Sequence, residues 1–433
     1  MPDSHTRSGT SAHRPLLGRI AATKWLSVWM PLGADVQSYN TRRVLLDGLG
    51  VAVGTAIAPF LPVLLARLGA SDFAVGLLSA MPALAGLLFV LPISRFLARQ
   101  RFIVPWYSTG RLIIIAGYAL SGAATLLTPD WRVAAILLIW ALATVPQTIV
   151  DVCFTIVMSG VAGPDRRLYL MSRRWSSIGL VTAVTVALAG LALQRIPFPL
   201  GYQIVLPALS LGGLFAYYFS SQIRLPPQTP AINAAQPAPA SPSLKASLSI
   251  ALRHPKFVRF TASQFVYRLG LAWALPLIPL YYVHNLRADD AQVGVINTVS
   301  SAVLLVAYLM WSRISKRRGI RFALLATTGG IALYPIILSQ LTQVGWVVVL
   351  AGLSGIFAAG IDLVFFDSLV SSYPPESSTL FLGLYQTTVY VVTFVGPLAG
   401  TALAQSIGIP GSLLVAGALR LAGFGLFAYL GEK

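Results

Sequence analysis

The sequence predicts an all-α polytopic membrane protein, in which about twelve transmembrane helices form two parallel halves of six helices each. Three observations carry this prediction: the composition, a succession of long apolar runs and an internal repeat. Of the 433 residues, 56% are hydrophobic and 10% are charged, and the mean hydropathy is +0.76. This is too little polar material to cover a soluble globule of that length, so we expect lipid to surround the chain.

The repeat relates the first half of the chain to the second. A basic segment that starts at Ser94 (SRFLARQR) returns at Ser312 (SRISKRRG), 218 residues later. The five letters GLFAY at 213–217 return unchanged at 425–429, at an offset of 212. Further pairs are Pro59 with Pro276, Pro62 with Pro279, and Asp151 with Asp362. Since the start, middle and end of one half find partners in the other, the sequence indicates a duplicated half.

Long apolar runs follow one another after residue 43, and each is long enough to cross the hydrocarbon core as a helix of ~20 residues. The predicted spans are 44–66, 73–94, 103–127, 133–160, 175–195, 199–222, 258–283, 291–312, 321–341, 345–370, 378–405 and 410–430. A Pro- and Ala-rich stretch at 225–243 lies between the sixth and seventh runs and has the composition of a linker. We therefore divide the chain into a tail (1–41), a first half (42–224), a linker (225–257) and a second half (258–433).

The basic residues set the orientation. Lys and Arg concentrate in the tail, the linker and alternate loops, whereas the other side receives Arg67, Arg132, Arg195 and Arg287. By the positive-inside rule, both termini and the linker are expected to be cytoplasmic, in the cell (inner) membrane. The formal net charge of +18 is thus explained by membrane orientation, and we expect no nucleic-acid partner.

Two six-helix halves in parallel, a cytoplasmic linker, and basic segments after the second and eighth spans resemble the major facilitator superfamily. That family's loop signature is present in degenerate form, since Arg95 and Arg99 match its basic residues while Ser94 stands where it has Asp. The resemblance implies a conformational role for these two loops, formed by Ser94, Arg95, Arg99, Ser312, Arg313 and Arg317. It also implies that the first, fourth, seventh and tenth helices line a central cavity.

Charged residues within the spans are the candidates for function, because each costs ~3 kcal/mol or more unless it is paired or hydrated. The candidates are Asp47, Asp151, Asp362, Asp367 and Arg268, because under the resemblance these five belong to cavity-lining helices. Asp151, Arg268 and Asp362 lie deepest and are expected in one layer, where they bind substrate or couple an ion. Asp47 and Asp367 are secondary candidates.

Polar and aromatic neighbours complete this candidate site. Gln147, Gln264 and Phe366 each lie one helical turn from one of the three deep charges and share its face. Asn297, Tyr385 and Gln386, with Trp273 and Tyr390, would add an amphipathic wall for a small organic molecule.

Charged residues within the spans also have structural interpretations that involve no substrate or ion. Arg268 could be a fixed clasp that neutralises Asp362 or Asp151. Asp47 is equally consistent with a charge near a helix N-terminus, favoured by the dipole. Arg111 and Arg420 fall on helices that the resemblance places outside the cavity, and we interpret both as structural residues paired within their own halves.

The leading functional hypothesis is a secondary transporter that moves a small organic solute by alternating access, with a proton as one candidate coupling ion. The alternative is a transport-inactive protein of the same fold that serves as an assembly or delivery factor. A lipid flippase or membrane enzyme is a third class, but the sequence has no cluster of His and acidic residues typical of an enzyme. We expect no catalytic residue, metal or cofactor, and a monomer in the bilayer.

Overall fold

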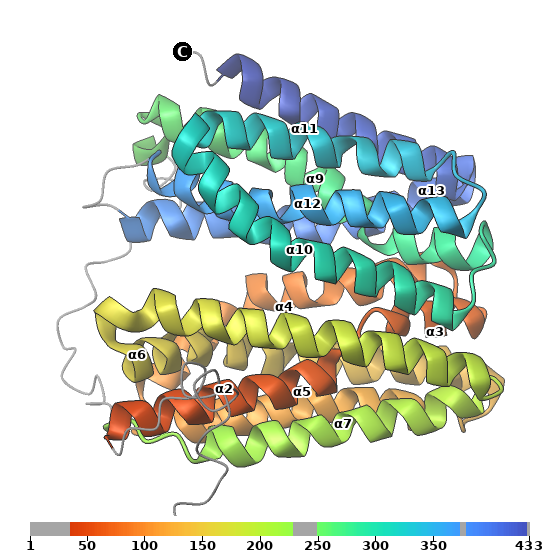
Figure 1. The fold of residues 1–433 in the computed structure, drawn as a ribbon, viewed down its shortest axis with the longest axis horizontal. Helices are drawn as coiled ribbons and strands as arrows, with labels where there is room; N and C mark the ends of the chain where they lie inside the picture. Colours follow the sequence, from red (N-terminus) through yellow and green to blue (C-terminus); the bar gives the residue numbers. More distant parts are fainter. Residues whose placement is uncertain (1–34, 228–248, 373–377, 431–433) are drawn as a thin grey trace, which may run out of the picture.

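The computed structural model describes residues 35–227, 249–372 and 378–430, and at some positions inside helices it describes the backbone alone. Most of the predicted tail and linker lies outside these ranges. The regular elements of the described residues are α-helices, which run side by side (Figure 1). The predicted all-α polytopic class is therefore confirmed.

The helices form two groups, one from each half of the chain, which Figure 1 shows as a lower and an upper layer. The first group contains α2 (Val36–Thr55), α3 (Phe60–Arg67), α4 (Asp72–Ala98), α5 (Val104–Ala124), α6 (Pro129–Arg195) and α7 (Leu200–Ser221). The second contains α9 (Pro255–His284), α10 (Asp290–Arg318), α11 (Ile320–Leu338), α12 (Val344–Val370) and α13 (Ser378–Leu430).

Ten helical stretches of the described chain are long and apolar enough to cross a membrane. The long α6 supplies two of them, Pro129–Ala162 and Arg173–Arg195. Another, Phe381–Leu430, covers two predicted spans, because α13 is interrupted at Gly408, whose φ of +76° suits a residue without a side chain. The 21-residue α5 lies outside these ten. All twelve predicted spans thus correspond to helices.

The start of the first span differs from the prediction. α2 begins at Val36, eight residues before the predicted span at 44, because the Asp35 carboxylate accepts from the Ser38 amide at 3.1 Å and caps the helix. The span is also divided into α2 and α3 by a turn that ends at Pro59. A proline lacks the amide hydrogen that a continuous helix needs, so the chain restarts there as a new helix.

The two groups meet along two helix pairs, α4 with α13 and α6 with α10, and at one end α3 also packs on α9. α6 and α10 approach closely at Gly190 and Gly294, since a Cβ on Gly190 would lie 2.8 Å from the Asp290 carbonyl oxygen and 3.1 Å from the Gly294 Cα. The largest apolar cluster also joins the groups, because it contains Phe60 of α3 and Leu280 of α9. These contacts leave a cavity between the groups.

Candidate functional site

The cavity between the two groups has a volume of about 580 Å³, within the range of small-molecule sites. Its lining includes Tyr118 and Trp140 from the first half, and Tyr282, Asn297, Tyr334 and Arg420 from the second. Among the predicted site residues, Asn297 lies in this lining, and its amide nitrogen donates to the Val293 carbonyl at 2.9 Å. The cavity is mainly apolar and aromatic, with a few polar groups.

Most polar groups of this lining have protein partners. The hydroxyls of Tyr282 and Tyr334 lie 2.8 Å apart, and the Trp140 indole donates to the Ser121 hydroxyl at 3.0 Å. Arg420 donates from Nε to the Gly270 carbonyl at 3.3 Å and from Nη1 to the Ile331 carbonyl at 3.1 Å. The expectation that this helix lies outside the cavity is wrong, because Arg420 of α13 lines it, but both contacts of Arg420 lie within its own half, as expected.

Asp151 and Gln147 share one face of α6, as their spacing predicts. The Gln147 amide donates to the Asp151 carboxylate at 2.9 Å, and the Asp151 side chain is exposed. Gln386 of α13 is also exposed. Neither residue lies in the lining of the 580 Å³ cavity. An exposed carboxylate in a spanning segment needs water, a substrate or a moving partner.

Gln264, Arg268 and Tyr385 form a second polar contact, between α9 and α13. With its amide oxygen turned toward the guanidinium, Gln264 accepts from Arg268 Nε at 2.7 Å and from Nη2 at 3.3 Å. The same amide bonds to the Tyr385 hydroxyl. The Arg268 guanidinium lies 5.6 Å above the Phe365 ring.

The clasp between Arg268 and Asp151 is not formed. Within the described residues, no carboxylate oxygen lies within 4.0 Å of the Arg268 guanidinium. Asp362, Phe366 and Asp367 occupy positions on α12, but their side chains lie outside the described part of the chain. The remaining pairing, Arg268 with Asp362, therefore stays a prediction.

Asp47 is the centre of a buried ion cluster. Its carboxylate is fully buried on α2 and is paired with Arg111 of α5. Arg174 of α6 reaches the same carboxylate at 3.3 Å, and the Tyr107 hydroxyl donates to it at 3.4 Å. The interpretation of Asp47 as a helix N-terminal charge is wrong, because α2 starts eleven residues earlier, at Val36. Arg111, by contrast, is paired within its own half, as expected.

Arg174 was not among the predicted site residues, although the repeat holds a signal for it. Asp47 and Gln264 are separated by 217 residues, the offset of Pro59 and Pro276; Arg174 and Tyr385 are separated by 211, the offset of Asp151 and Asp362. The contact of Asp47 with Arg174 thus occupies the place in the first half that the contact of Gln264 with Tyr385 occupies in the second. Applying the offset of 211 to Tyr385, a predicted site residue, would have drawn attention to Arg174.

A third polar group joins the two halves at the end where α3 ends and α10 begins. Arg67 and Asp290 form an ion pair at 3.1 Å, and the Tyr202 hydroxyl donates to Asp290 at 2.7 Å. Beside them, the Gln194 amide donates to the Asp289 carboxylate at 3.0 Å. Sequence reasoning missed this group because its ion pair, Arg67 with Asp290, lies just outside the predicted spans.

The two basic segments are helix ends. Ser94 and Arg95 lie in the last turns of α4, with Arg99 at its C-cap, and Arg313 and Arg317 lie in α10. The prediction that they form loops is therefore wrong, although Ser312 is described by its place in α10 alone. Cations suit these positions because the last turn of a helix carries partial negative charge.

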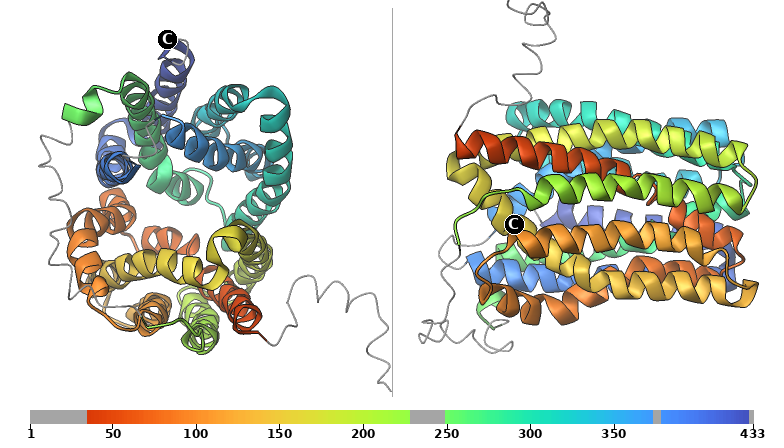
Figure 2. Two further views of the ribbon diagram at one scale, coloured as in Figure 1. Left: turned by 90° about the vertical axis from the view of Figure 1, so that its left-hand side faces the viewer. Right: turned by 90° about the horizontal axis from the view of Figure 1, so that it is seen from below.

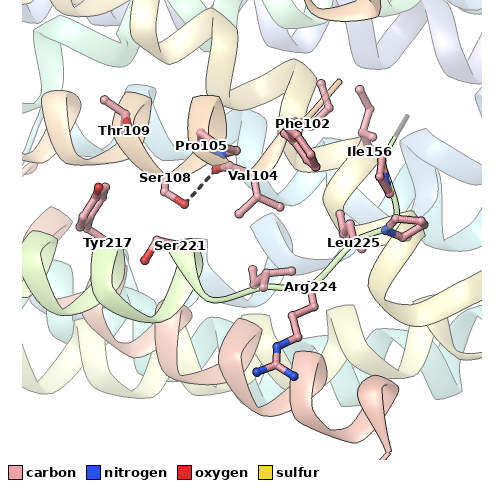
Figure 3. A pocket seen from close by; sticks show the side chains of 15 residues that line it. Phe102, Val104, Pro105, Ser108, Thr109, Ile156, Tyr217, Ser221, Arg224 and Leu225 are labelled. Atoms are coloured by element: carbon pink, nitrogen blue, oxygen red, sulfur yellow. Dashed lines mark hydrogen bonds between the residues drawn. The ribbon is translucent and has the colours of Figure 1, made fainter. Parts of the chain in front are cut away.

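A further cavity, of about 650 Å³, lies at the side of the first half, between the start of α5 and the end of α7 (Figure 3). Ser108 lines it, but its hydroxyl donates to the Val104 carbonyl at 3.0 Å. Figure 3 shows the Arg224 guanidinium pointing away from the cavity, and it stacks on the Tyr39 ring at 4.7 Å. In the part of the chain that the structure describes, no three His, Cys, Asp or Glu residues are grouped to hold a metal ion.

Two groups of helices, which Figure 2 shows end-on, and a cavity that residues of both groups line define a polytopic all-helical protein. The sequence model of the Major Facilitator Superfamily matches residues 260–433. The nucleoside transporter NupG, solved as a point mutant, is similar at a TM-score of 0.66 and 12% identity over 92% of this chain and 100% of that chain.

A bacterial homologue of the iron transporter ferroportin, solved in an inward-facing state, is similar at a TM-score of 0.70 and 14% identity over 91% of this chain and 99% of that chain. No curated protein sequence matches significantly. The predicted resemblance to the major facilitator superfamily is confirmed by the family model for residues 260–433, and the predicted multi-pass helical fold is confirmed by both solved structures.

Proposed function

We propose that this protein is a secondary transporter that moves a small organic solute across the membrane by alternating access. One observation carries the proposal: a cavity of about 580 Å³ is lined by both halves. Movement of one half against the other would change access to such a cavity while its contents stay in place. The transport-inactive alternative would have a filled interior, so this cavity disfavours it.

The present conformation fits one state of that cycle. Contacts between the halves close the end that holds Arg67 and Asp290. Asp151 and Gln386, from opposite halves, are exposed. This arrangement supports a form open on the side that we propose to be cytoplasmic, and the similar ferroportin homologue is described as inward-facing.

The chemistry of the cavity supports an organic solute. Tyr118, Trp140, Tyr282 and Tyr334 offer ring faces and edges, and Asn297 adds an amide. The two similar solved proteins are named for a nucleoside and for iron, which belong to different chemical classes, so their names do not select a substrate. We propose that the protein needs no cofactor and acts as a monomer.

Asp151, Asp362 and Arg268 are the residues we propose for ion coupling or substrate charge. The support from geometry is that Asp151 is exposed within a spanning segment and that Arg268 holds a neutral amide where it could hold a carboxylate. A guanidinium that exchanges Gln264 for Asp362 would link protonation of that carboxylate to the position of the halves. The negative charge of the Asp362 carboxylate could instead hold a cationic solute.

Purified full-length protein in liposomes tests the function. Saturable uptake of a solute from a chemically diverse panel, faster with an imposed pH gradient, is the expected result. If every solute equilibrates no faster than in empty liposomes, with and without the gradient, the transport proposal fails and the assembly-factor alternative gains. Reporter fusions after Gln228 and at Lys433 test the cytoplasmic placement of the linker and the C-terminus, and an external signal at either contradicts it.

A further inference from the structure

Arg420 is a buried charge that the proposed coupling mechanism does not use. Its side chain extends from α13 into the wall of the cavity between the halves, and 3% of the residue is exposed. Among the described residues that line this cavity, it is the one with a formal charge. A guanidinium stays protonated in proteins, so the cavity wall carries a fixed positive charge.

Within the described residues, carbonyl oxygens hold this charge and no carboxylate neutralises it. Nε and Nη1 donate to the carbonyls of Gly270 and Ile331, whereas Nη2 has no acceptor among the described residues. No carboxylate oxygen in the described part of the chain lies within 4.0 Å of the guanidinium. This differs from Arg111, whose charge is balanced by Asp47.

The packing around Arg420 fixes the direction of its side chain. A Cβ on Gly270 would lie 2.7 Å from the Ala416 carbonyl oxygen and 2.9 Å from Arg420 Cγ, so α9 and α13 touch here because position 270 has no side chain. The two carbonyl contacts hold Nε and Nη1 against the second half. The remaining edge of the planar guanidinium is then available to a ligand in the cavity.

A buried, unpaired cation in a membrane protein carries a large free-energy cost, which a bound anion offsets. We propose that Arg420 binds the anionic group of the transported solute, a carboxylate or a phosphate on a small organic molecule with an apolar or aromatic body. The tyrosine and tryptophan rings of the cavity would contact that body. The inference rests on the proposed transport function and names the class of its substrate.

Binding to detergent-solubilised full-length protein tests the site with phenylacetate and its neutral isostere phenylacetamide. A charge-assisted hydrogen bond predicts that phenylacetate binds about tenfold tighter or more, measured by calorimetry and by the rise in Tm. Arg420→Gln should remove this preference. Arg420→Lys should keep part of it, because lysine retains the charge but not the planar fork.

Arg132→Gln is the matched control. Arg132 also donates to a backbone carbonyl, that of Leu127 at 2.9 Å, but it is not part of the cavity lining. It should bind both probes as the wild type does. Inorganic phosphate, titrated in parallel, separates a compact anion from an organic acid, and loss of its binding in Arg420→Gln would also support the site.

Equal binding of phenylacetate and phenylacetamide by the wild type, no binding of any of the three probes, or an unchanged preference in Arg420→Gln would overturn the inference. Should Arg420→Gln fail to yield monodisperse protein, Arg420→Lys and the wild-type comparison still decide. Arg420-dependent binding without uptake in liposomes would refute the transport proposal and support the anion site at Arg420. Saturable uptake without a preference for anions would support the transport proposal and refute the anion site.

Discussion

The two halves differ in the polar contacts at corresponding positions. In the first half, Asp47 lies fully buried between Arg111 and Arg174, so the charges are held in place. In the second, Gln264 stands at the position of Asp47, and its neutral amide accepts from Arg268 at 2.7 Å. A buried ion pair is difficult to break, whereas an arginine held by an amide can exchange partners at little cost. The comparison suggests a fixed first half and a second half that rearranges.

Breaking the fixed cluster should have the largest effect. Asp47→Asn leaves two buried arginines without their carboxylate, which costs about 3–5 kcal/mol for a broken buried pair. We expect a large fall in Tm and a loss of monodisperse protein, measured by thermal unfolding and size-exclusion chromatography. The matched change in the second half, Gln264→Ala, should cost less, about 1.5–3 kcal/mol, the value of a hydrogen bond to a charged group. Equal losses in the two variants would contradict the comparison.

The proposed rearrangement of the second half is tested through transport. Asp362→Asn should abolish accumulation driven by a pH gradient but retain counterflow exchange if the carboxylate couples a proton, because a neutral amide cannot take up and release one. Loss of both activities would point to substrate binding instead. Asp151→Asn should show a weaker form of the same defect.

Asp130→Asn, on the exposed start of α6, is the control for these carboxylates and should transport normally. Normal transport at every pH by both Asp362→Asn and Asp151→Asn would leave Arg268 as a structural clasp.

The contacts between the halves should give a smaller effect. Asp290→Asn removes the ion pair with Arg67 and weakens the bond from Tyr202. If this end loses about 1–2 kcal/mol of stabilisation, the population of molecules that are open at this end should rise roughly 5–30-fold. In a Cys153→Ser background, labelling of a Ser79→Cys reporter in the cavity lining by an impermeant maleimide should rise accordingly. Arg195→Gln, exposed nearby, is the control, and unchanged labelling in Asp290→Asn would remove the closing role of this ion pair.

The basic end of α10 should give the smallest effect. Arg313, Lys316 and Arg317 are exposed in its last turns, where each is expected to contribute about 0.3–1 kcal/mol with the helix dipole and about 1 kcal/mol with anionic lipid. Replacing all three with Gln should lower the amount of protein in the membrane by a few-fold, measured by quantitative blotting of membrane fractions. Full insertion and full transport in this variant would leave the repeated basic segment without the proposed role.

The sequence by itself determined the membrane class, the twelve spans and the repeat. These follow from the length of apolar runs and from repeated letters, which tertiary contacts do not change. It also identified Asp151 with Gln147 and Arg268 with Gln264, because residues four apart on a helix share a face. Asp47 was found but misjudged, since its partner Arg174 lies 127 residues away.

Only the tertiary structure decided which charges meet and which side chain turns inward. Arg67 and Asp290 come from different halves, and Arg420 lines a cavity that its helix was expected to avoid. In a membrane protein, lipid and the protein interior are both apolar, so the hydropathy pattern of a spanning helix does not mark the face that turns to a neighbour or a cavity. That choice is made by close packing between helices, as at Gly190 and Gly294 or at Gly270 and Arg420, where the absence of a side chain lets two helices touch.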